Sequence, residues 1–131
     1  MRKGGRHELS ILAAVARQRE LGGRGDRLPE GDLTGTISAF LHHKGDPHAQ
    51  DGYSTRAIYA AWHTAVIEWT PQSVTFYLDG RVIGTSTNPA VIPSTPMHWV
   101  LQTETQLSGG PPSDSAAGNV RIDWVTAYTH N

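Results

Sequence analysis

Glu30 is the residue best placed to do chemistry in the stretch GRGDRLPEGDLTGTISAFLHH. It follows a proline and precedes a strand-like run, TISAFLHH. A positioned carboxylate can pass a proton, but a general acid without a nucleophile gives only weak catalysis. Most glutamates are simply solvated at the surface. The role of Glu30 therefore depends on which groups the surrounding elements bring beside it.

The composition limits what those elements can be. The chain has 131 residues, enough for one domain with a modest core. It has no cysteine, no apolar run approaching about 18 residues, and a net charge of −1. We therefore expect no disulfide framework, no membrane span and no nucleic-acid partner.

Two unlike segments meet near Leu28. Residues 1–28 carry seven Arg or Lys and three acids, whereas residues 29–131 carry four and nine and contain all ten aromatic residues. We predict that residues 1–28 are a tail, either solvated or with a short helix over 7–21, and that GGRGDR is a flexible linker. The apolar stretch LSILAAVA is short for a secretory signal and is interrupted by serine.

From residue 35 onward, the pattern indicates strands and turns. Short runs rich in Val, Ile, Thr and aromatic residues are bounded by Gly, Pro, Asn and Asp. Asp79-Gly80 is the strongest hairpin signal, because a type I′ turn needs positive φ at both central residues. Strands are predicted at 35–43, 62–69, 73–78, 81–86, 97–104 and 119–128. Such a set predicts an all-β sandwich or barrel.

Alternation divides each predicted strand into an apolar side and a mixed side. In TISAFLHH, the apolar side carries Ile37, Ala39 and Leu41. The mixed side carries Thr36, Ser38, Phe40 and His42. The apolar sides suit a core between two sheets. An open sheet face with polar and aromatic side chains suits an extended sugar chain.

Three blocks, WHTAVIEWTPQSVTFYLDGRVIGTS, IPSTPMHWVLQTET and GNVRIDWVTAY, resemble the second half of a glycoside hydrolase family 16 domain. This family contains β-glucanases of the laminarinase and lichenase type with a concanavalin A-like jelly roll. The resemblance implies a partial jelly roll over residues 29–131, without a cofactor. It also implies retaining hydrolysis of β-1,3 or mixed-linkage β-glucan and an extracellular location.

The family's active-site strand carries Glu-x-Asp-x-x-Glu, in which the resemblance implies a nucleophile, an orienting acid and an acid/base. Aligned on PEG, Glu30 takes the acid/base position, while Gly25 and Arg27 take the other two. A bulge tolerated by Pro29 would return Glu30 to the face of residues 25 and 27. Retaining hydrolysis needs two carboxylates about 5–5.5 Å apart. We therefore predict little or no turnover.

A shifted reading frame would account for the broken motif. Residues 25–28 can be encoded GGA GAT CGA CTT, and the same letters followed by C, read one base later, give Glu-Ile-Asp-Phe. We hypothesise that residues 1–28 are out of frame with a family 16 gene that resumes at Pro29. Coding DNA that does not give this motif in the shifted frame would remove the hypothesis.

Four further residues are candidates for binding substrate. His42 lies on the mixed side and can hydrogen-bond a sugar, and the resemblance implies that Gln102 lines the site. Glu104 is either a second carboxylate there or a solvated residue. Trp62, like Phe40, can stack on a pyranose ring or pack against neighbouring strands.

Other polar and aromatic residues have simpler interpretations. The segment HHKGDPHAQDG lacks a compact ligand spacing and is predicted to be a polar loop, so no zinc site is assigned. Asp123 matches a calcium position of the family whose other ligands come from the first half of the domain, so no metal is assigned there either. His63, Trp69, Trp99 and Trp124 are predicted to lie in the core.

Two alternatives to an enzyme stay open. One is a carbohydrate-binding β-sandwich that retains the open face without chemistry. The other is an inactive gene fragment. Exposed strand edges in a partial sandwich would favour self-association.

Overall fold

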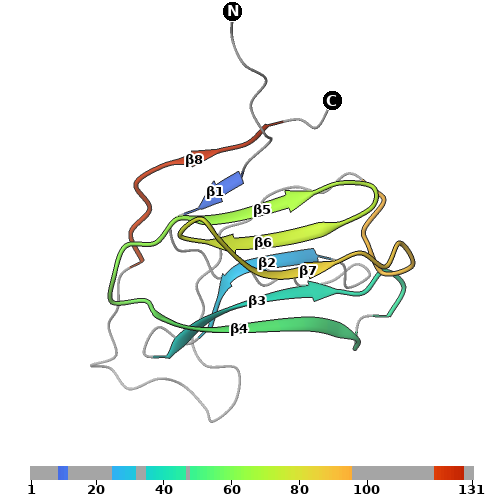
Figure 1. Cartoon of the computed structure of the whole chain (residues 1–131), viewed down its shortest axis with the longest axis horizontal. Helices are drawn as coiled ribbons and strands as arrows, with labels where there is room; N and C mark the ends of the chain where they lie inside the picture. Colours follow the sequence, from blue (N-terminus) through green and yellow to red (C-terminus); the bar gives the residue numbers. More distant parts are fainter. Residues whose placement is uncertain (1–8, 12–24, 32–34, 47, 96–119, 129–131) are drawn as a thin grey trace, which may run out of the picture.

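The computed structural model describes residues 9–11, 25–31, 35–46, 48–95 and 120–128. Every regular element in these ranges is a β-strand, and every strand pair is antiparallel (Figure 1). The strands are β1 (Leu9–Ile11), β2 (Gly25–Glu30), β3 (Thr36–His42), β4 (Gln50–Ile58), β5 (Ala65–Trp69), β6 (Val74–Leu78), β7 (Arg81–Ser86) and β8 (Val125–Thr126). The predicted all-β fold class is confirmed.

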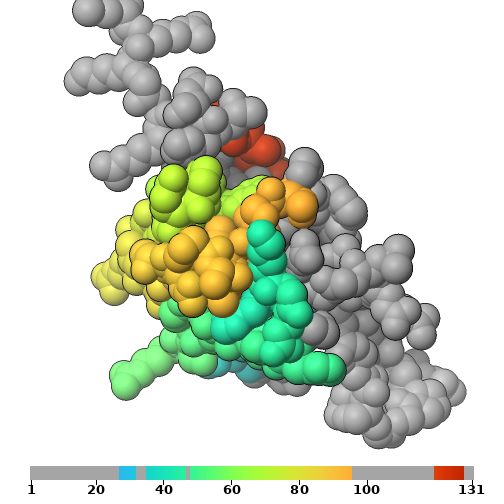
Figure 2. Space-filling model, turned by 90° about the vertical axis from the view of Figure 1, so that its right-hand side faces the viewer, coloured from blue at the N-terminus to red at the C-terminus, as the bar shows by residue number. Residues whose placement is uncertain are grey.

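The strands form two sheets that pack as a partial sandwich. The larger has the order β7-β6-β5-β1-β8, and the smaller has the order β2-β3-β4. The smaller sheet lies against β5 and β7 of the larger one. Figure 2 shows the gold and orange residues of β7 and the following segment directly against the teal and green residues of β3 and β4.

The core lies between the two sheets and follows the period of two expected of half-buried strands. The alternate residues of β3 that were predicted to face inward are all buried, and alternate residues of β6 are buried opposite them. Together these residues are Ile37, Ala39 and Leu41 of β3 with Val74, Phe76 and Leu78 of β6. Trp69 packs against this cluster, as predicted, and its Nε1 donates to the carbonyl of Pro93 at 3.0 Å.

The hairpin between β6 and β7 turns at Asp79-Gly80, as predicted. Both residues have positive φ, 51° and 75° respectively, as a type I′ turn requires. The amide of Asp79 donates to the carbonyl of Thr64 at 2.8 Å, and the amide of Thr64 donates to the Asp79 carboxylate at 2.9 Å. These two bonds hold the turn against the start of β5.

Tyr53 of the smaller sheet reaches across the core and packs against Gly84 of the larger sheet. The ring of Tyr53 on β4 lies 5.8 Å, centroid to centroid, from the ring of Phe76. A Cβ added to Gly84 on β7 would lie 2.1 Å from Cγ of Tyr53. The register of β6 and β7 shifts at the same point. The missing side chain at Gly84 therefore allows the two sheets to approach.

Two predictions for the first segment are wrong where the structure describes it. Leu9–Ile11 form a strand paired with β5 and β8, and not part of a helix over 7–21. Pairing across strands outweighs the weak helix propensity of this short segment. Residues 25–27 belong to β2 and pair with residues 40–42 of β3. They are therefore not a flexible linker.

β4 was not predicted, and the end of the expected polar loop belongs to it. Its inward-facing residues, including Tyr53, Thr55 and Ala57, are half-buried, while the residues between them are exposed. The exposed positions hold glycine, serine and arginine, so the strand lacks the dense β-branched content that identifies strands in sequence.

Several predicted strand limits also differ. β5 begins at Ala65 and not at residue 62, and β8 covers only Val125–Thr126 within the described part of 119–128. Trp124 is 48% exposed and not in the core, because β8 pairs with β1 over only two residues. The strand predicted over 97–104 and Trp99 lie outside the described residues.

His63 joins the end of β4 to the hairpin between β6 and β7. Its Nδ1 donates to Oδ2 of Asp79 at 2.7 Å, and its Nε2 faces the carbonyl of Ile58 at 2.9 Å. Burial alone would lower the pKa of His63, but these two bonds and the charge of Asp79 raise it overall. Because both ring nitrogens face acceptors, the protonated ring fits this place best. His63 is thus bonded at both ring nitrogens, but it lies at the end of the sandwich and not in the core, where it was predicted.

The substitution His63→Gln is expected to destabilise the protein by about 1 kcal/mol near pH 5 to 6, after allowance for the exposure of Asp79. The effect should fade as the pH rises through the folded-state pKa of His63, which lies above the ordinary histidine value of 6.5. It should also fade in strong acid, because the pKa of Asp79 is lowered and its contribution is lost as the pH falls through that value. Urea unfolding at a series of pH values measures both limits.

His48→Gln is the matched control, because the His48 side chain is exposed and makes no hydrogen bond with the described residues. It should leave the free energy of unfolding unchanged at every pH. A loss for His63→Gln that is equally large at pH 5 and pH 9 would contradict the role given to the protonated ring.

Candidate functional site

The outer face of the smaller sheet carries the predicted mixed residues. Phe40 and His42 of β3 alternate with the buried Ala39 and Leu41, so they face away from the core. Their neighbours on β4 are small or polar, because Ser54 pairs with Ser38, Gly52 with Phe40 and Gln50 with His42. The result is a polar surface with one aromatic ring near its middle.

β2 brings Glu30 to this face through a bulge. Arg27 pairs with Phe40, and Glu30 pairs with Ser38, with a register shift between the two pairs. The shift places two residues, Leu28 and the fully buried Pro29, opposite one position of β3. On a regular strand, residues 27 and 30 would face opposite sides. The bulge expected at Pro29 is therefore confirmed.

The charge beside Glu30 is positive. Nη1 of Arg27 lies 3.4 Å from Oε1 of Glu30, and the two side chains are 17% and 23% exposed respectively. A strong charge-assisted hydrogen bond would be about 2.7–2.9 Å long, so this pair is loose. Position 25, where the resemblance would place the nucleophile, is a glycine paired with His42. A carboxylate is thus absent at both positions.

Tyr59 lies close to Glu30 and was not predicted. Its hydroxyl is buried and makes no hydrogen bond with any described residue. Burial, followed by the negative charge of Glu30, raises the pKa of this phenol far above its ordinary value. Tyr59 therefore stays neutral, with a proton available to a hydrogen-bond acceptor.

Gly31 allows this arrangement at the end of β2. It has a φ of 153°, and an added Cβ would lie 2.6 Å from the carbonyl oxygen of Thr36 and 3.3 Å from the hydroxyl of Tyr59. A side chain would be strained and would also collide there. The glycine after Glu30 is the one sequence signal that could have indicated a close approach at this place.

His42 is a neutral imidazole at neutral pH. Burial, then the positive charge of Arg27 and then that of His43 lower its pKa. A neutral imidazole has one donor and one acceptor nitrogen, which suits a hydroxyl group. His43 makes a separate contact, with its Nε2 2.8 Å from Oδ1 of Asp51.

Phe40 packs along Gly52 on the neighbouring strand. A Cβ added to Gly52 would lie 3.2 Å from Cε1 of Phe40. The residue opposite Phe40 therefore has no side chain to cover the ring, which is half-buried and not enclosed.

The structure brings only some of the predicted binding residues together. Trp62 is 61% exposed and lies in the segment after β4, outside the strand predicted for it. Gln102 and Glu104 lie outside the described residues. In the part of the chain that the structure describes, no three His, Cys, Asp or Glu side chains converge as metal ligands. No helix there is long and apolar enough to cross a membrane.

The fold and the site define an all-β sandwich with a polar, aromatic-bearing outer sheet face. The family model "Glycosyl hydrolases family 16" matches residues 30–126, beginning at Glu30 itself. The chain therefore belongs to glycoside hydrolase family 16. No curated protein and no solved structure matches it.

Proposed function

We propose that this chain is a β-glucan-binding member of family 16 that holds its polysaccharide without efficient hydrolysis. The observation that carries the proposal is the contact of Arg27 with Glu30, at 3.4 Å on β2. Glu30 takes the acid/base role in this assignment. A guanidinium group stands where the motif has its orienting acid, and Gly25 stands where it has its nucleophile.

The chemistry of retention explains why binding without cleavage is the better assignment. One carboxylate must form a glycosyl-enzyme bond while the other passes a proton to the leaving oxygen. Gly25 has no atom that can attack an anomeric carbon. A neighbouring guanidinium also favours an ionised carboxylate, and an ionised carboxylate cannot protonate a leaving group. Proton transfer and covalent catalysis are therefore both impaired.

The same face has the groups that hold a neutral sugar chain. A pyranose ring can pack its apolar side on the Phe40 ring, while Ser38 and the neutral His42 exchange hydrogen bonds with hydroxyl groups. The small residues of β4 leave this surface open along the strand. The proposed ligand is a β-1,3 or mixed-linkage β-glucan, and such a polymer implies work outside the cell.

Binding of laminarin by the whole chain tests the proposal. Phe40→Ala should weaken binding about tenfold, since loss of an aromatic contact costs about 1 kcal/mol or slightly more. Tyr128→Ala is the matched control, because Tyr128 is 59% exposed and follows β8 in the other sheet. Isothermal titration calorimetry measures both. Absence of saturable binding, or equal losses in the two variants, would contradict the assignment.

A further inference from the structure

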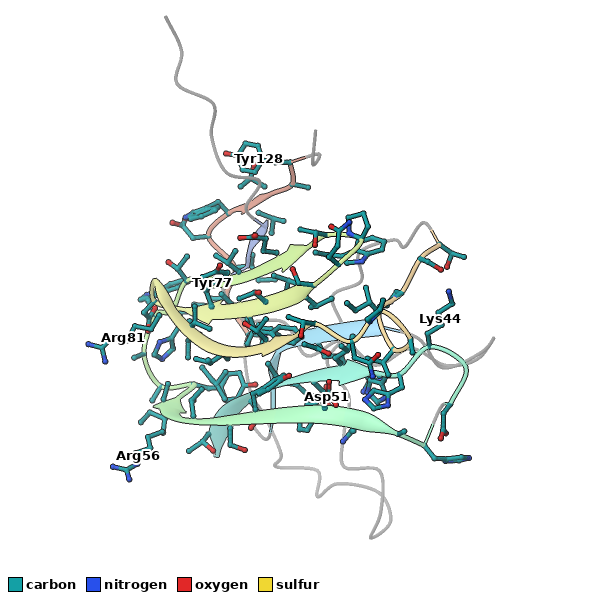
Figure 3. All side chains as sticks on the ribbon, turned by 45° about the vertical axis from the view of Figure 1, so that its right-hand side comes forward. Lys44, Asp51, Arg56, Tyr77, Arg81 and Tyr128 are labelled. Atoms are coloured by element: carbon teal, nitrogen blue, oxygen red, sulfur yellow. The ribbon has the colours of Figure 1, made fainter. Side chains whose placement is uncertain are left out.

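One end of the sandwich carries two exposed arginines and three exposed apolar side chains. We call it the basic end, and it consists of Arg56, Ile58, Trp62, Arg81 and Val82. Figure 3 shows Arg56 and Arg81 extending from the same end of the molecule, with Lys44 at the opposite end.

The contact between the two sheets places Arg56 and Arg81 at the same end of the sandwich. Tyr53 of β4 packs on Gly84 of β7. Arg56 lies three residues after Tyr53, and Arg81 lies three residues before Gly84. Each arginine is therefore about 10 Å along its strand from the contact, towards the hairpin end of the sandwich.

Hydrogen bonds of His63 hold the neighbouring Trp62 at the basic end. The His63 ring joins the carbonyl of Ile58, at 2.9 Å, to the carboxylate of Asp79, at 2.7 Å. Asp79 is two residues from Arg81, and Trp62 directly precedes His63. The exposed indole is thus held beside the ends of β4 and the hairpin by a bonded neighbour.

The charge of this end contrasts with that of its surroundings. Residues 29–131 contain four basic and nine acidic side chains, and two of the four basic ones are at this end. Asp79, two residues before Arg81 in the sequence, is bonded to His63 and to the amide of Thr64. Neither arginine makes an ion pair with another described residue. Both guanidinium groups are therefore available to an external anion.

Exposed apolar area lies among these charges. Trp62 is 61% exposed, Val82 is 59% exposed and Ile58 is 51% exposed. A partner of this surface must offer anionic groups together with flat apolar faces.

We propose that the basic end is a second binding surface and that it takes an acidic polysaccharide of uronic acid units. The planar fork of each guanidinium matches a carboxylate with two parallel hydrogen bonds. The indole of Trp62 can stack on the apolar side of a sugar ring. A polyuronate repeats both features along its chain, so two arginines and one indole can be engaged at once. Arg56 and Ile58 are outward-facing residues at the end of β4, whereas the residues assigned to glucan, Ser38, Phe40 and His42, lie on β3. The two surfaces therefore share no assigned binding residue, and this proposal does not depend on glucan binding.

Titration of the whole chain with polygalacturonic acid tests the second surface. Arg56→Gln/Arg81→Gln should weaken binding about tenfold, and Trp62→Ala should weaken it several-fold. The parent's affinity should also fall as salt rises, because the guanidinium groups are exposed. The matched control is Lys44→Gln/Arg121→Gln, which removes the same charge from two other exposed positions and should change affinity less than twofold.

Three outcomes would overturn this proposal. Equal losses in the two double variants would mean that net charge alone attracts the polymer. Equally tight binding of dextran sulfate, unchanged by Trp62→Ala, would mean that any polyanion suffices. Binding of phosphatidylglycerol vesicles without binding of polygalacturonic acid would assign the surface to a membrane. Laminarin binding by the Arg56→Gln/Arg81→Gln variant should be unchanged. A loss of the polyuronate proposal can therefore be told apart from a loss of the glucan-binding proposal.

Discussion

Replacing Gly84 with alanine is expected to lower the free energy of unfolding by about 3 kcal/mol or more, the upper part of the range for overpacked cores. The new Cβ would lie 2.1 Å from Cγ of Tyr53 and 2.2 Å from one of its Cδ atoms. The Tyr53 ring cannot simply withdraw, because it lies between β7 and the ring of Phe76. Thermal unfolding should show a midpoint lower by roughly 10 °C.

Gly52→Ala is the control for this substitution. Its added Cβ would lie 3.2 Å from Phe40, a ring at the surface of the sheet that can shift by a few tenths of an ångström. Its cost should be below about 1 kcal/mol. Tyr53→Leu combined with Gly84→Ala should recover part of the loss, since the two residues touch. A Gly84→Ala protein as stable as the parent would contradict the packing described between the sheets.

The double substitution Gly25→Glu/Arg27→Asp is expected to create glucan hydrolysis, an activity that we propose the unmodified chain lacks. Positions 25 and 27 lie on one face of β2, and the bulge adds Glu30 to that face. The variant would supply a nucleophile, remove the guanidinium from Glu30 and complete the pair of carboxylates that retention needs. Release of reducing ends from laminarin should rise at least about a hundredfold, the low end for a positioned acid or base.

Glu30→Gln in the same background should remove the gained activity, because the leaving group would lose its proton donor. Arg27→Asp alone should gain nothing, since it still lacks a nucleophile. Thermal midpoints of all variants show whether each is folded. A folded double variant without product would mean that positions 25, 27 and 30 are not aligned for catalysis.

The parts of the fold that could be predicted are those determined by residues close together in the sequence. The Asp79-Gly80 turn and the two strands beside it depend on neighbouring residues, and both were predicted. β4 was missed because its exposed positions are small or polar, so its alternation is weak. β1 was missed because three residues carry almost no strand signal. Their strand conformation comes from pairing with β5 and β8, which lie far away in the sequence.

In the candidate site, too, the features that depend on neighbouring residues were predicted, and those that depend on distant ones were missed. The outward side of β3 follows from alternation, and the bulge before Glu30 follows from a proline in a recognisable family motif. Tyr59 could not be predicted, because it approaches Glu30 only through the way the chain leaves β4. The exposed position of Trp62 has a similar cause, since His63 and Thr64 are bonded to Asp79 and β5 begins only at Ala65.

Binding without cleavage is tested by long incubation of the unmodified chain with laminarin and with lichenan, followed by mass spectrometry of the products. We expect saturable binding with no release of oligosaccharides above a protein-free blank. Oligosaccharide release that is abolished by Glu30→Gln would contradict it, because it would require a second reactive group opposite Glu30.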